Sequence, residues 1–351
     1  MSGERCRIIC ADVLDGLRLL SDESVHCVVT SPPYFALRDY GVDGQIGLEK
    51  TPNLYVEKMV EVFREVRRVL RADGTLWLNI GDSYASDWPC NRRSTIGAVS
   101  LPNGKREARP ARLGGDLKTK DLIGIPWMLA FALRADGWYL RCDVIWNKPN
   151  PMPESVTDRP SKAHEYLFLL AKSERYYYNH VAIRTPAAQS SIQRWNQNIE
   201  MQEGSHRANG GAKTNGTMKA VGGNDRVVCP SGHSRRHAGF NDRWDLMEKA
   251  EQVAGGANAR SVWTIATQPY AAAHFATFPE NLVKPCVLAG SPEDGTVLDP
   301  FMGSGTTGLV AMRYGRNFIG IELNPEYVEL AKQRLAPVIA QQDLFTTAGA
   351  L

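Results

Sequence analysis

The sequence predicts an α/β fold, and three observations support that class. Residues 55–80 show an apolar helical face, an Asp-Gly pair and then an apolar strand, which is a standard α/β unit. Residues 295–322 show a strand, a glycine-rich turn, a helix and a second strand, which is a βαβ unit. Residues 25–30 form a short apolar strand that must stop at Pro32-Pro33, because proline lacks a backbone donor and has a fixed φ.

Composition narrows the class of protein. The chain has 351 residues, 43% hydrophobic and 23% charged, which is typical of a globular protein with one large or two ordinary domains. The net charge is only +3, so a surface for nucleic acid would have to be a local patch. Seven cysteines without a C-x-x-C pair favour reduced thiols in a cytoplasmic compartment. No secretory leader or membrane span is expected, since the sequence has no long apolar run.

The first half of the chain is expected to alternate strands and helices. Apolar residues recur at helical spacing in residues 55–70, and Asp73-Gly74 is expected to turn the chain into the next strand. Pro126 lies early enough to be tolerated in the first turn of a later helix. The expected strands are 7–10, 25–30, 75–80, 137–146, 165–171 and 175–179, the last two as a hairpin, and the expected helices are 13–20, 55–70 and 122–135.

Two segments interrupt this order. Residues 82–119 and 185–260 are rich in small and polar residues and in arginine, and apolar periodicity nearly disappears from the second. They are either solvated loops or surfaces that contact phosphates, and both interpretations stay open at this point. The candidate DNA-contact residues are Arg92, Arg93, Arg235, Arg236 and Arg38, the last of which either contacts the nucleotide or braces its loop.

The second of these segments also holds Cys229, His233 and His237. Three such side chains are potential zinc ligands, but a fourth at a known spacing is missing, so we expect no metal site. Regular structure is expected again from residue 262 onwards. The expected helices are 275–289, 309–314 and 325–335, and the expected strands are 295–299 and 317–322.

The proline corner after the second strand is a candidate site. Thr30-Ser31-Pro32-Pro33-Tyr34 gives a rigid turn with a hydroxyl and an aromatic ring at a strand end, where open α/β sheets place ligands. An ordinary strand end with a buried Tyr34 explains the same five residues equally well. Asp12, just past the first strand, is likewise either a helix N-cap or a ligand acceptor, and from the residue alone the N-cap is favoured.

Residues 299–322 are a candidate nucleoside-binding site. Gly303, Gly305 and Gly308 satisfy G-x-G-x-x-G and let the backbone approach a ligand closely. Glu322 ends the next strand, where it can accept hydrogen bonds from both hydroxyls of a ribose. A nicotinamide cofactor is one candidate. Asp299 would repel a pyrophosphate and suits a ligand with a positive amino group, such as S-adenosylmethionine.

Together, these motifs resemble those of the β class of DNA amino-methyltransferases, which methylate N4 of cytosine or N6 of adenine. The target motif of that family, Ser/Asp/Asn-Pro-Pro-Tyr/Phe, is matched by the catalytic residues Ser31, Pro32, Pro33 and Tyr34. The cofactor motif, Asp-Pro-Phe-x-Gly-Ser-Gly-Thr-Thr, is matched by Asp299, Pro300, Phe301, Gly303, Ser304, Gly305, Thr306 and Thr307. Weaker matches to the family's cofactor contacts are Asp12 for adenine, Phe278, Pro279 and Leu282 for the methionine part, and Glu322 for the ribose.

The resemblance implies a Rossmann-like methyltransferase sheet, mostly parallel with an antiparallel hairpin at one edge, assembled from both chain ends. Residues 1–184 and 262–351 would form the catalytic domain, and residues 185–261 an inserted lobe that recognises the target. The implied cofactor is S-adenosyl-L-methionine, and the implied partner is double-stranded DNA with a flipped base. The implied setting is the cytoplasm of a prokaryote, with the gene carried by the host or by a phage.

The sequence leaves several alternatives open. Serine at the first motif position favours N4 of cytosine slightly over N6 of adenine. A nicotinamide-dependent oxidoreductase, a DNA-binding protein without activity, and RNA or protein as methyl acceptor are more remote alternatives. Whether the chain forms a homodimer, and whether a cognate restriction endonuclease accompanies it or it is an orphan enzyme, cannot be read from the residues.

Overall fold

The computed structural model describes residues 5–37, 41–42, 44–85, 117–186, 256–268 and 279–348, with side chains to residue 341. The chain divides into two compact units, one of residues 1–183 and 260–351, the other of residues 184–259. The helices and strands named below belong to the first unit. Of the predicted recognition insertion the two ends are described, and Thr185 and Ala257 form an antiparallel bridge there. The insertion as a domain therefore stays a prediction.

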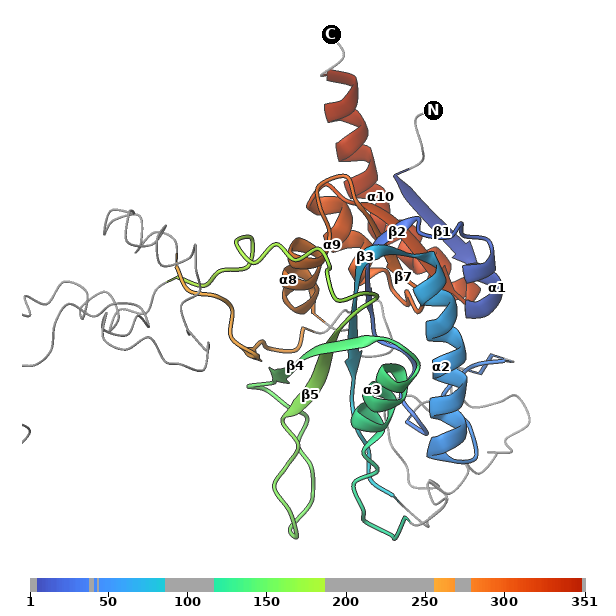
Figure 1. Ribbon diagram of the computed structural model, residues 1–351, viewed down its shortest axis with the longest axis vertical. Helices are drawn as coiled ribbons and strands as arrows, with labels where there is room; N and C mark the ends of the chain where they lie inside the picture. Colours follow the sequence, from blue (N-terminus) through green and yellow to red (C-terminus); the bar gives the residue numbers. More distant parts are fainter. Residues whose placement is uncertain are drawn as a thin grey trace, which may run out of the picture. The chain divides into compact units, whose positions relative to one another are not determined.

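An eight-stranded sheet lies at the centre of the first unit (Figure 1). Its strand order is β1-β8-β7-β2-β3-β5-β4-β6. β5 is antiparallel to both of its neighbours, and the other described pairs are parallel. Strands from the two ends of the chain are neighbours, which confirms the predicted mostly parallel sheet. The strands are β1 (Cys6–Cys10), β2 (Val25–Thr30), β3 (Leu70–Ile80), β4 (Tyr139–Asn147), β5 (His164–Ala171), β6 (Val262–Thr264), β7 (Thr296–Asp299) and β8 (Asn317–Glu322).

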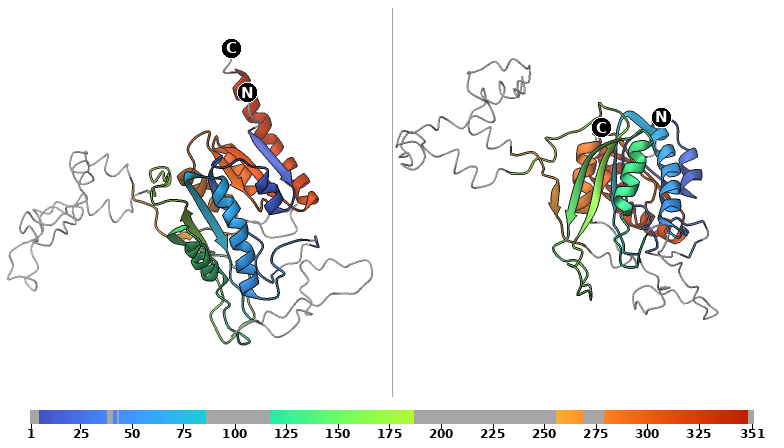
Figure 2. Two further views of the ribbon diagram at one scale, coloured as in Figure 1. Left: turned by 45° about the vertical axis from the view of Figure 1, so that its right-hand side comes forward. Right: turned by 60° about the horizontal axis from the view of Figure 1, so that its bottom comes forward.

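Helices cover both faces of this sheet (Figures 1 and 2). The N-terminal helices α1, α2 and α3 pack into one apolar core, and the C-terminal helices α8, α9 and α10 pack into a second. Because side chains alternate along a strand, Leu76 and Leu78 of β3 lie in the first core while Trp77 lies in the second. The helices are α1 (Val13–Arg18), α2 (Pro52–Val69), α3 (Ile125–Ala135), α8 (Glu280–Gly290), α9 (Thr306–Arg313) and α10 (Pro325–Ala348).

Several helix ends differ from the sequence prediction. α2 begins at Pro52 rather than at residue 55, because Thr51 caps it and accepts a hydrogen bond from the Leu54 amide at 3.3 Å. α3 and α9 begin behind glycines in the left-handed region, at residue 125 rather than 122 and at residue 306 rather than 309. α10 continues beyond residue 335, because Val338 and Ile339 still pack against the second core.

The turn expected at Asp73-Gly74 is wrong. β3 starts at Leu70, directly after α2, and includes both residues. Along β2 the register shifts, since Val25 pairs with Leu70 and Cys27 with Thr75, so residues 71–74 form a bulge in β3. Helix and strand are therefore joined without a loop.

The hairpin expected between 165–171 and 175–179 is also wrong. β5 pairs with β3 on one edge and with β4 on the other, so neither edge is free for a further strand. Residues 175–179 instead run irregularly, with the Tyr177 amide donating to Asp73 O at 2.8 Å. Tyr178 stacks on Trp77, with ring centroids 6.4 Å apart. The antiparallel hairpin of this sheet is formed by β4 and β5.

Two further properties concern membrane-spanning helices and cysteines. Among the described residues, no helix combines the length and the apolar character that crossing a membrane requires. The cysteines in that part of the chain, namely Cys6, Cys10, Cys27, Cys142 and Cys286, are free thiols.

The close packing of α8 on the sheet gives a stability prediction. A Cβ at Gly290 would lie 2.6 Å from Thr75 Oγ1 and 2.7 Å from Cys27 Sγ. We expect Gly290→Ala to lower the free energy of unfolding by about 1–3 kcal/mol, because these buried atoms would have to move apart. Urea unfolding measures the change, with Asn281→Ala on the exposed side of the same helix as the control. Equal midpoints for Gly290→Ala and the wild type would contradict the packing described here.

Candidate active site

The proline corner and the glycine turn meet at one edge of the sheet. β2 and β7 are hydrogen-bonded neighbours, with Cys27 opposite Val297 and Val28 opposite Leu298. Both strands are parallel, so their carboxyl ends point to the same edge, which is where open α/β sheets bind ligands. Thr30 ends β2 and Asp299 ends β7, and Thr30 Oγ1 donates a hydrogen bond to Asp299 Oδ1 at 2.7 Å. Two motifs from opposite ends of the chain are thereby joined directly.

Asp299 is the fully buried centre of this junction. Besides Thr30, its carboxylate accepts hydrogen bonds from Thr307 Oγ1 at 2.8 Å and from the Phe301 amide at 3.1 Å. Burial raises the pKa of Asp299 to about 6, the three hydrogen bonds oppose that change, and the charge of Glu322 adds to it. These contacts hold β2, the turn and α9 together. Contact of this carboxylate with a cationic ligand stays a prediction.

Glu322, at the end of β8, holds the glycine turn from the other side. Its Oε2 accepts from the Gly303 amide at 2.8 Å, and its Oε1 accepts from the Asn324 amide at 2.9 Å. Gly303 and Gly305 have φ values of 52° and 78°, a region that glycine enters without steric cost. Burial raises the pKa of the Glu322 carboxyl above its usual value. The turn is thus closed onto a carboxylate.

A small hollow opens beside this turn, at the carboxyl ends of β1, β8 and β7. It brings together four of the residues predicted to bind the cofactor: Asp12, Pro300, Phe301 and Glu322. Asp12 also caps α1, its Oδ1 accepting from the Leu14 amide at 2.9 Å. The other described residues that line the hollow are Ala11, Val13, Gly44, Ile46, Ile321 and Leu323.

Other residues predicted to bind the cofactor do not line this hollow. Ser304 Oγ and Thr306 Oγ1 accept hydrogen bonds from Arg334 of α10, at 3.1 and 2.9 Å. Thr307 bonds to Asp299, as described above. Leu282 is 1% exposed within the second core, and Pro279 precedes the first residue of α8. Whether any of these residues contacts a ligand stays a prediction.

A hydrogen bond from helix α2 holds the proline corner in place. Tyr55 of α2 donates a hydrogen bond from its hydroxyl to the carbonyl of Pro33 at 2.8 Å. Pro32 is buried, whereas Ser31, Pro33 and Tyr34 are half-buried at the edge of the sheet. This bond adds a further constraint to a turn that two prolines already restrict.

Two residues that the sequence analysis did not select bond to the hydroxyl of Tyr34, and a third pairs with one of them. Tyr34 donates to Glu165 Oε2 at 2.7 Å, and Asn79 Nδ2 donates to the Tyr34 oxygen at 2.9 Å. Lys148 Nζ forms an ion pair with Glu165 Oε1. Burial, and then the negative charge of Glu165, raise the pKa of the Tyr34 phenol well above its usual value. Asn79 within an apolar strand and Glu165 at the start of another were the available sequence signals.

Other predicted residues fall outside the described part of the chain. These are Phe278 of the cofactor set, the DNA-contact candidates Arg38, Arg92, Arg93, Arg235 and Arg236, and the cluster of Cys229, His233 and His237. In the described residues, no cluster of three or more His, Cys, Asp and Glu side chains suits a metal ion.

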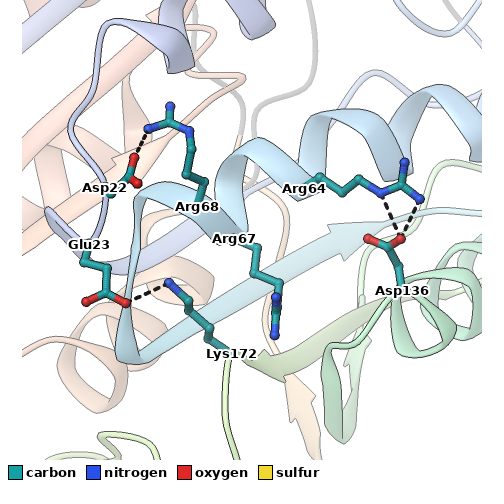
Figure 3. A pocket seen from close by; sticks show the side chains of 7 residues that line it. All are labelled: Asp22, Glu23, Arg64, Arg67, Arg68, Asp136 and Lys172. Carbon is teal, nitrogen blue, oxygen red and sulfur yellow. Dashed lines mark hydrogen bonds and ion pairs between the residues drawn. The ribbon is translucent and has the colours of Figure 1, made fainter.

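A larger hollow lies at the opposite ends of the strands (Figure 3). It is lined by charged side chains that pair with one another: Arg64 with Asp136 at 2.7 Å, Arg68 with Asp22 at 2.5 Å, and Lys172 with Glu23 at 3.2 Å. Lys172 follows the carboxyl end of the antiparallel strand β5, so it marks the amino ends of the parallel strands. This hollow is therefore separate from the candidate site.

Comparison with known proteins gives consistent results. A family profile described as DNA methylase matches residues 25–333. The Type II methyltransferase M.Cfr9I of Citrobacter freundii is 43% identical over 328 residues, which cover 92% of this chain and 85% of that protein. The cytosine-N4-specific PvuII DNA methyltransferase structure matches 96% of this chain and 92% of its own, with a TM-score of 0.56 and 16% identity. A putative DNA modification methylase of Thermus thermophilus, in complex with S-adenosyl-L-methionine, covers 95% of both chains, with a TM-score of 0.51 and 22% identity.

The burial of Asp299 predicts a pH-dependent stability. Its folded pKa of about 6 exceeds the ordinary 3.8, so the folded state binds the proton more tightly and loses stability as pH rises through this interval. Relative to Asp299→Asn, we expect the wild type to lose about 2 kcal/mol of unfolding free energy between about pH 4.5 and about pH 7.5.

Urea unfolding without ligand at several pH values measures this difference. Asp22→Asn is the control, because the Asp22 side chain is 73% exposed. A difference between the wild type and Asp299→Asn that does not change with pH would contradict the described burial of this carboxyl.

Proposed function

Because this chain belongs to the DNA methylase family, we propose that the proline corner holds the acceptor base and that the hollow beside the glycine turn holds the methyl donor. The enzyme transfers a methyl group from S-adenosyl-L-methionine to an exocyclic amino group in DNA, N4 of cytosine or N6 of adenine. The proposal concerns which residues perform each part of this reaction. We assign the acceptor base to Ser31, Pro32, Pro33 and Tyr34, and the donor to Asp12, Pro300, Phe301 and Glu322.

The hydrogen bond between Thr30 and Asp299 is the observation that supports this assignment most strongly. It is 2.7 Å long and joins residues 269 positions apart in the sequence. Ser31 directly follows one partner, and Pro300-Phe301 directly follows the other. A base held at the corner and a donor held at the turn would therefore face each other across one buried contact. Such fixed placement of two reactants is a major source of rate enhancement.

The acceptor side must make a weak nucleophile reactive. The lone pair of an exocyclic amine is conjugated into the ring of the base, so the planar amine attacks poorly. We propose that Ser31 Oγ and the Pro32 carbonyl accept the two N–H groups, which favours a pyramidal nitrogen whose lone pair is free to attack. The prolines fix these acceptors in advance, and the Tyr34 ring stacks on the base. To reach this corner, the base must leave the duplex.

The donor side has the charge that S-adenosyl-L-methionine requires. When bound, that cofactor supplies a methyl group on a cationic sulfonium, and it carries a ribose, an adenine and an ammonium but no phosphate. Among the described residues that line the hollow, two are carboxylates, Asp12 and Glu322, and none is Lys or Arg. These two carboxylates would repel the negative charge of a pyrophosphate. The lining therefore favours the sulfonium cofactor over a nicotinamide cofactor.

Finer features of the reaction are part of the same proposal. Serine rather than aspartate at position 31 favours N4 of cytosine as the acceptor. We assign target recognition to residues 185–261, where Arg235 and Arg236 would contact phosphates, with Arg92, Arg93 and Arg38 as further DNA contacts. The free thiols suit a cytoplasmic location. Homodimer formation, and a cognate restriction endonuclease as against an orphan enzyme, stay open alternatives that no contact in the described residues addresses.

Paired substitutions test the assignment of the two halves. We expect Ser31→Ala to lower the methylation rate on the order of 100-fold while leaving cofactor affinity within about 2-fold, because it removes an acceptor used on the base alone. We expect Glu322→Gln to weaken cofactor binding by roughly 10-fold or more, because it removes the charge from the ribose acceptor and from the turn. Single-turnover transfer of a labelled methyl group gives the rate, and calorimetry gives the affinity.

Each variant is the control for the other. Loss of cofactor affinity in Ser31→Ala, or unchanged affinity in Glu322→Gln, would contradict the division of roles. A fully active Ser31→Ala would remove the acceptor role of the serine.

A further inference from the structure

A chain of hydrogen bonds runs beneath the proline corner and ends at Glu165. Ser31 Oγ lies 3.4 Å from the Tyr34 oxygen, and the Tyr34 oxygen lies 2.7 Å from Glu165 Oε2. Asn79 Nδ2 lies 2.9 Å from the Tyr34 oxygen and 3.1 Å from Glu165 Oε2. Lys148 pairs with the other carboxylate oxygen. Glu165 and Lys148 are 16% and 18% exposed, so this pair is largely withdrawn from water.

The donors around Glu165 determine its state. Lys148 has N–H groups to give, and so has the amide nitrogen of Asn79, whereas neither group accepts a hydrogen bond. A protonated carboxyl could donate its O–H only to the Tyr34 oxygen, and it would forgo the ion pair with Lys148. The ionised carboxylate satisfies all of these donors, and an ionised carboxylate is an acceptor only. Glu165 therefore forms the negative end of the chain.

That end fixes the direction of every proton in the chain. Because Glu165 can only accept, the Tyr34 hydroxyl must donate to it. The raised pKa of the Tyr34 phenol agrees with this, since the group keeps its proton. The Tyr34 oxygen then accepts, and its available donors are Asn79 Nδ2 and the Ser31 hydroxyl. The Tyr34 oxygen keeps a second lone pair beside the one that Asn79 uses, and the Ser31 hydroxyl can direct its proton inward to it at 3.4 Å.

The direction of the Ser31 hydroxyl matters for the acceptor base. A hydroxyl has one proton and two lone pairs, and it can rotate. If the proton pointed at the base, it would oppose the N–H groups of the exocyclic amine. With the proton directed at Tyr34 and one lone pair facing Asn79 Nδ2 at 3.5 Å, the other lone pair of Ser31 stays available to an N–H group of the amine. The serine is thereby fixed as an acceptor before the base arrives.

We propose that Glu165 is a positioning residue that sets the proton direction of Ser31 through the hydroxyl of Tyr34. This inference rests on the proposed role of Ser31 as an acceptor for the exocyclic amine. It gives Tyr34 a second task besides stacking. It also assigns tasks to Asn79, which holds the Tyr34 oxygen, and to Lys148, which pairs with the second oxygen of Glu165.

The framework that holds these residues is rigid. Ser31 follows β2, Asn79 lies in β3, Glu165 lies in β5 and Lys148 follows β4, and these are neighbouring strands. Glu165 is paired with Trp146 in the β4–β5 ladder, and Lys148 Nζ lies 4.3 Å from the centroid of the Trp146 ring. Side chains anchored on strands are placed more precisely than side chains on loops. The family's target motif also admits phenylalanine at the position of Tyr34, and phenylalanine has no hydroxyl. The proposed role of Glu165 therefore applies only to sequences with tyrosine at this position, such as this one.

Glu165→Gln is the first test, because it keeps the shape and replaces the acceptor with a group that can donate. A donating amide allows Tyr34 to turn its proton toward Ser31. We expect the single-turnover methylation rate to fall at least about 10-fold, with cofactor affinity and KM for DNA nearly unchanged. The matched control is Glu23→Gln, which removes another Glu–Lys pair, with Lys172, at the far end of β5 (Figure 3). This control should methylate at the wild-type rate.

Tyr34→Phe is the second test, and it stands even if Glu165→Gln does not fold. It keeps the ring and removes only the hydroxyl through which Glu165 acts. We expect it to slow methylation at least about 10-fold, and we expect the double variant to be within about 2-fold of Tyr34→Phe alone. The inference would be overturned if the rate loss of the double variant equalled the product of the two single losses. It would also be overturned if Tyr34→Phe methylated at the wild-type rate.

The outcomes separate this inference from the proposed function. A wild-type protein that fails to methylate DNA would overturn the proposed function itself. An active wild type with an equally active Glu165→Gln variant would overturn only the positioning role. A Glu165→Gln variant whose loss appears in melting temperature and in cofactor affinity alike would show a structural role, and it would also overturn the proposal.

Discussion

A single buried carboxylate organises this molecule. Asp299 accepts hydrogen bonds from Thr30, Thr307 and the Phe301 amide, so one side chain fixes the end of β2, the glycine turn and the start of α9. Keeping a carboxylate in a fully buried position is costly unless it is well bonded, and three donors meet that need. Because its partners come from both ends of the chain, this edge of the sheet depends on contacts between distant segments. The acceptor corner and the donor turn are then placed as one unit.

The charged side chains at the carboxyl ends of the parallel strands differ from those at their amino ends. At the carboxyl ends, the described cofactor hollow has carboxylates and no basic side chain, and in the neighbouring corner the Tyr34 hydroxyl is bonded to Glu165. At the amino ends, three basic residues are paired with carboxylates on the surface. A cationic donor fits the first environment, and the second has the ordinary features of a solvated ion-paired surface. The chemistry of the site thus follows from the direction of the strands.

Local constraint decided how much of this could be predicted from the sequence. Pro32-Pro33 and the glycines after Asp299 restrict the backbone within a few residues, so the sequence alone indicates both motifs. The fold that joins them was implied by the resemblance of the two motifs to a known family. The Thr51-Pro52 helix start carried a local signal that the apolar pattern obscured.

The errors concern contacts between distant segments. Tyrosine-rich residues 175–179 have strand propensity, but both edges of β5 were already occupied. Asn79 and Glu165 become meaningful only once β3 and β5 are neighbours, and composition does not reveal that pairing.

The central claim is that the corner and the turn together transfer a methyl group to an exocyclic amine of DNA. The most direct measurement is mass spectrometry of nucleosides from unmethylated DNA incubated with the protein and methyl-deuterated S-adenosyl-L-methionine. The account predicts deuterated N4-methylcytosine, formed by the wild type and strongly reduced with Ser31→Ala. Deuterated N6-methyladenine in its place would contradict the choice of base, and the absence of deuterium from both amino groups would contradict the account as a whole.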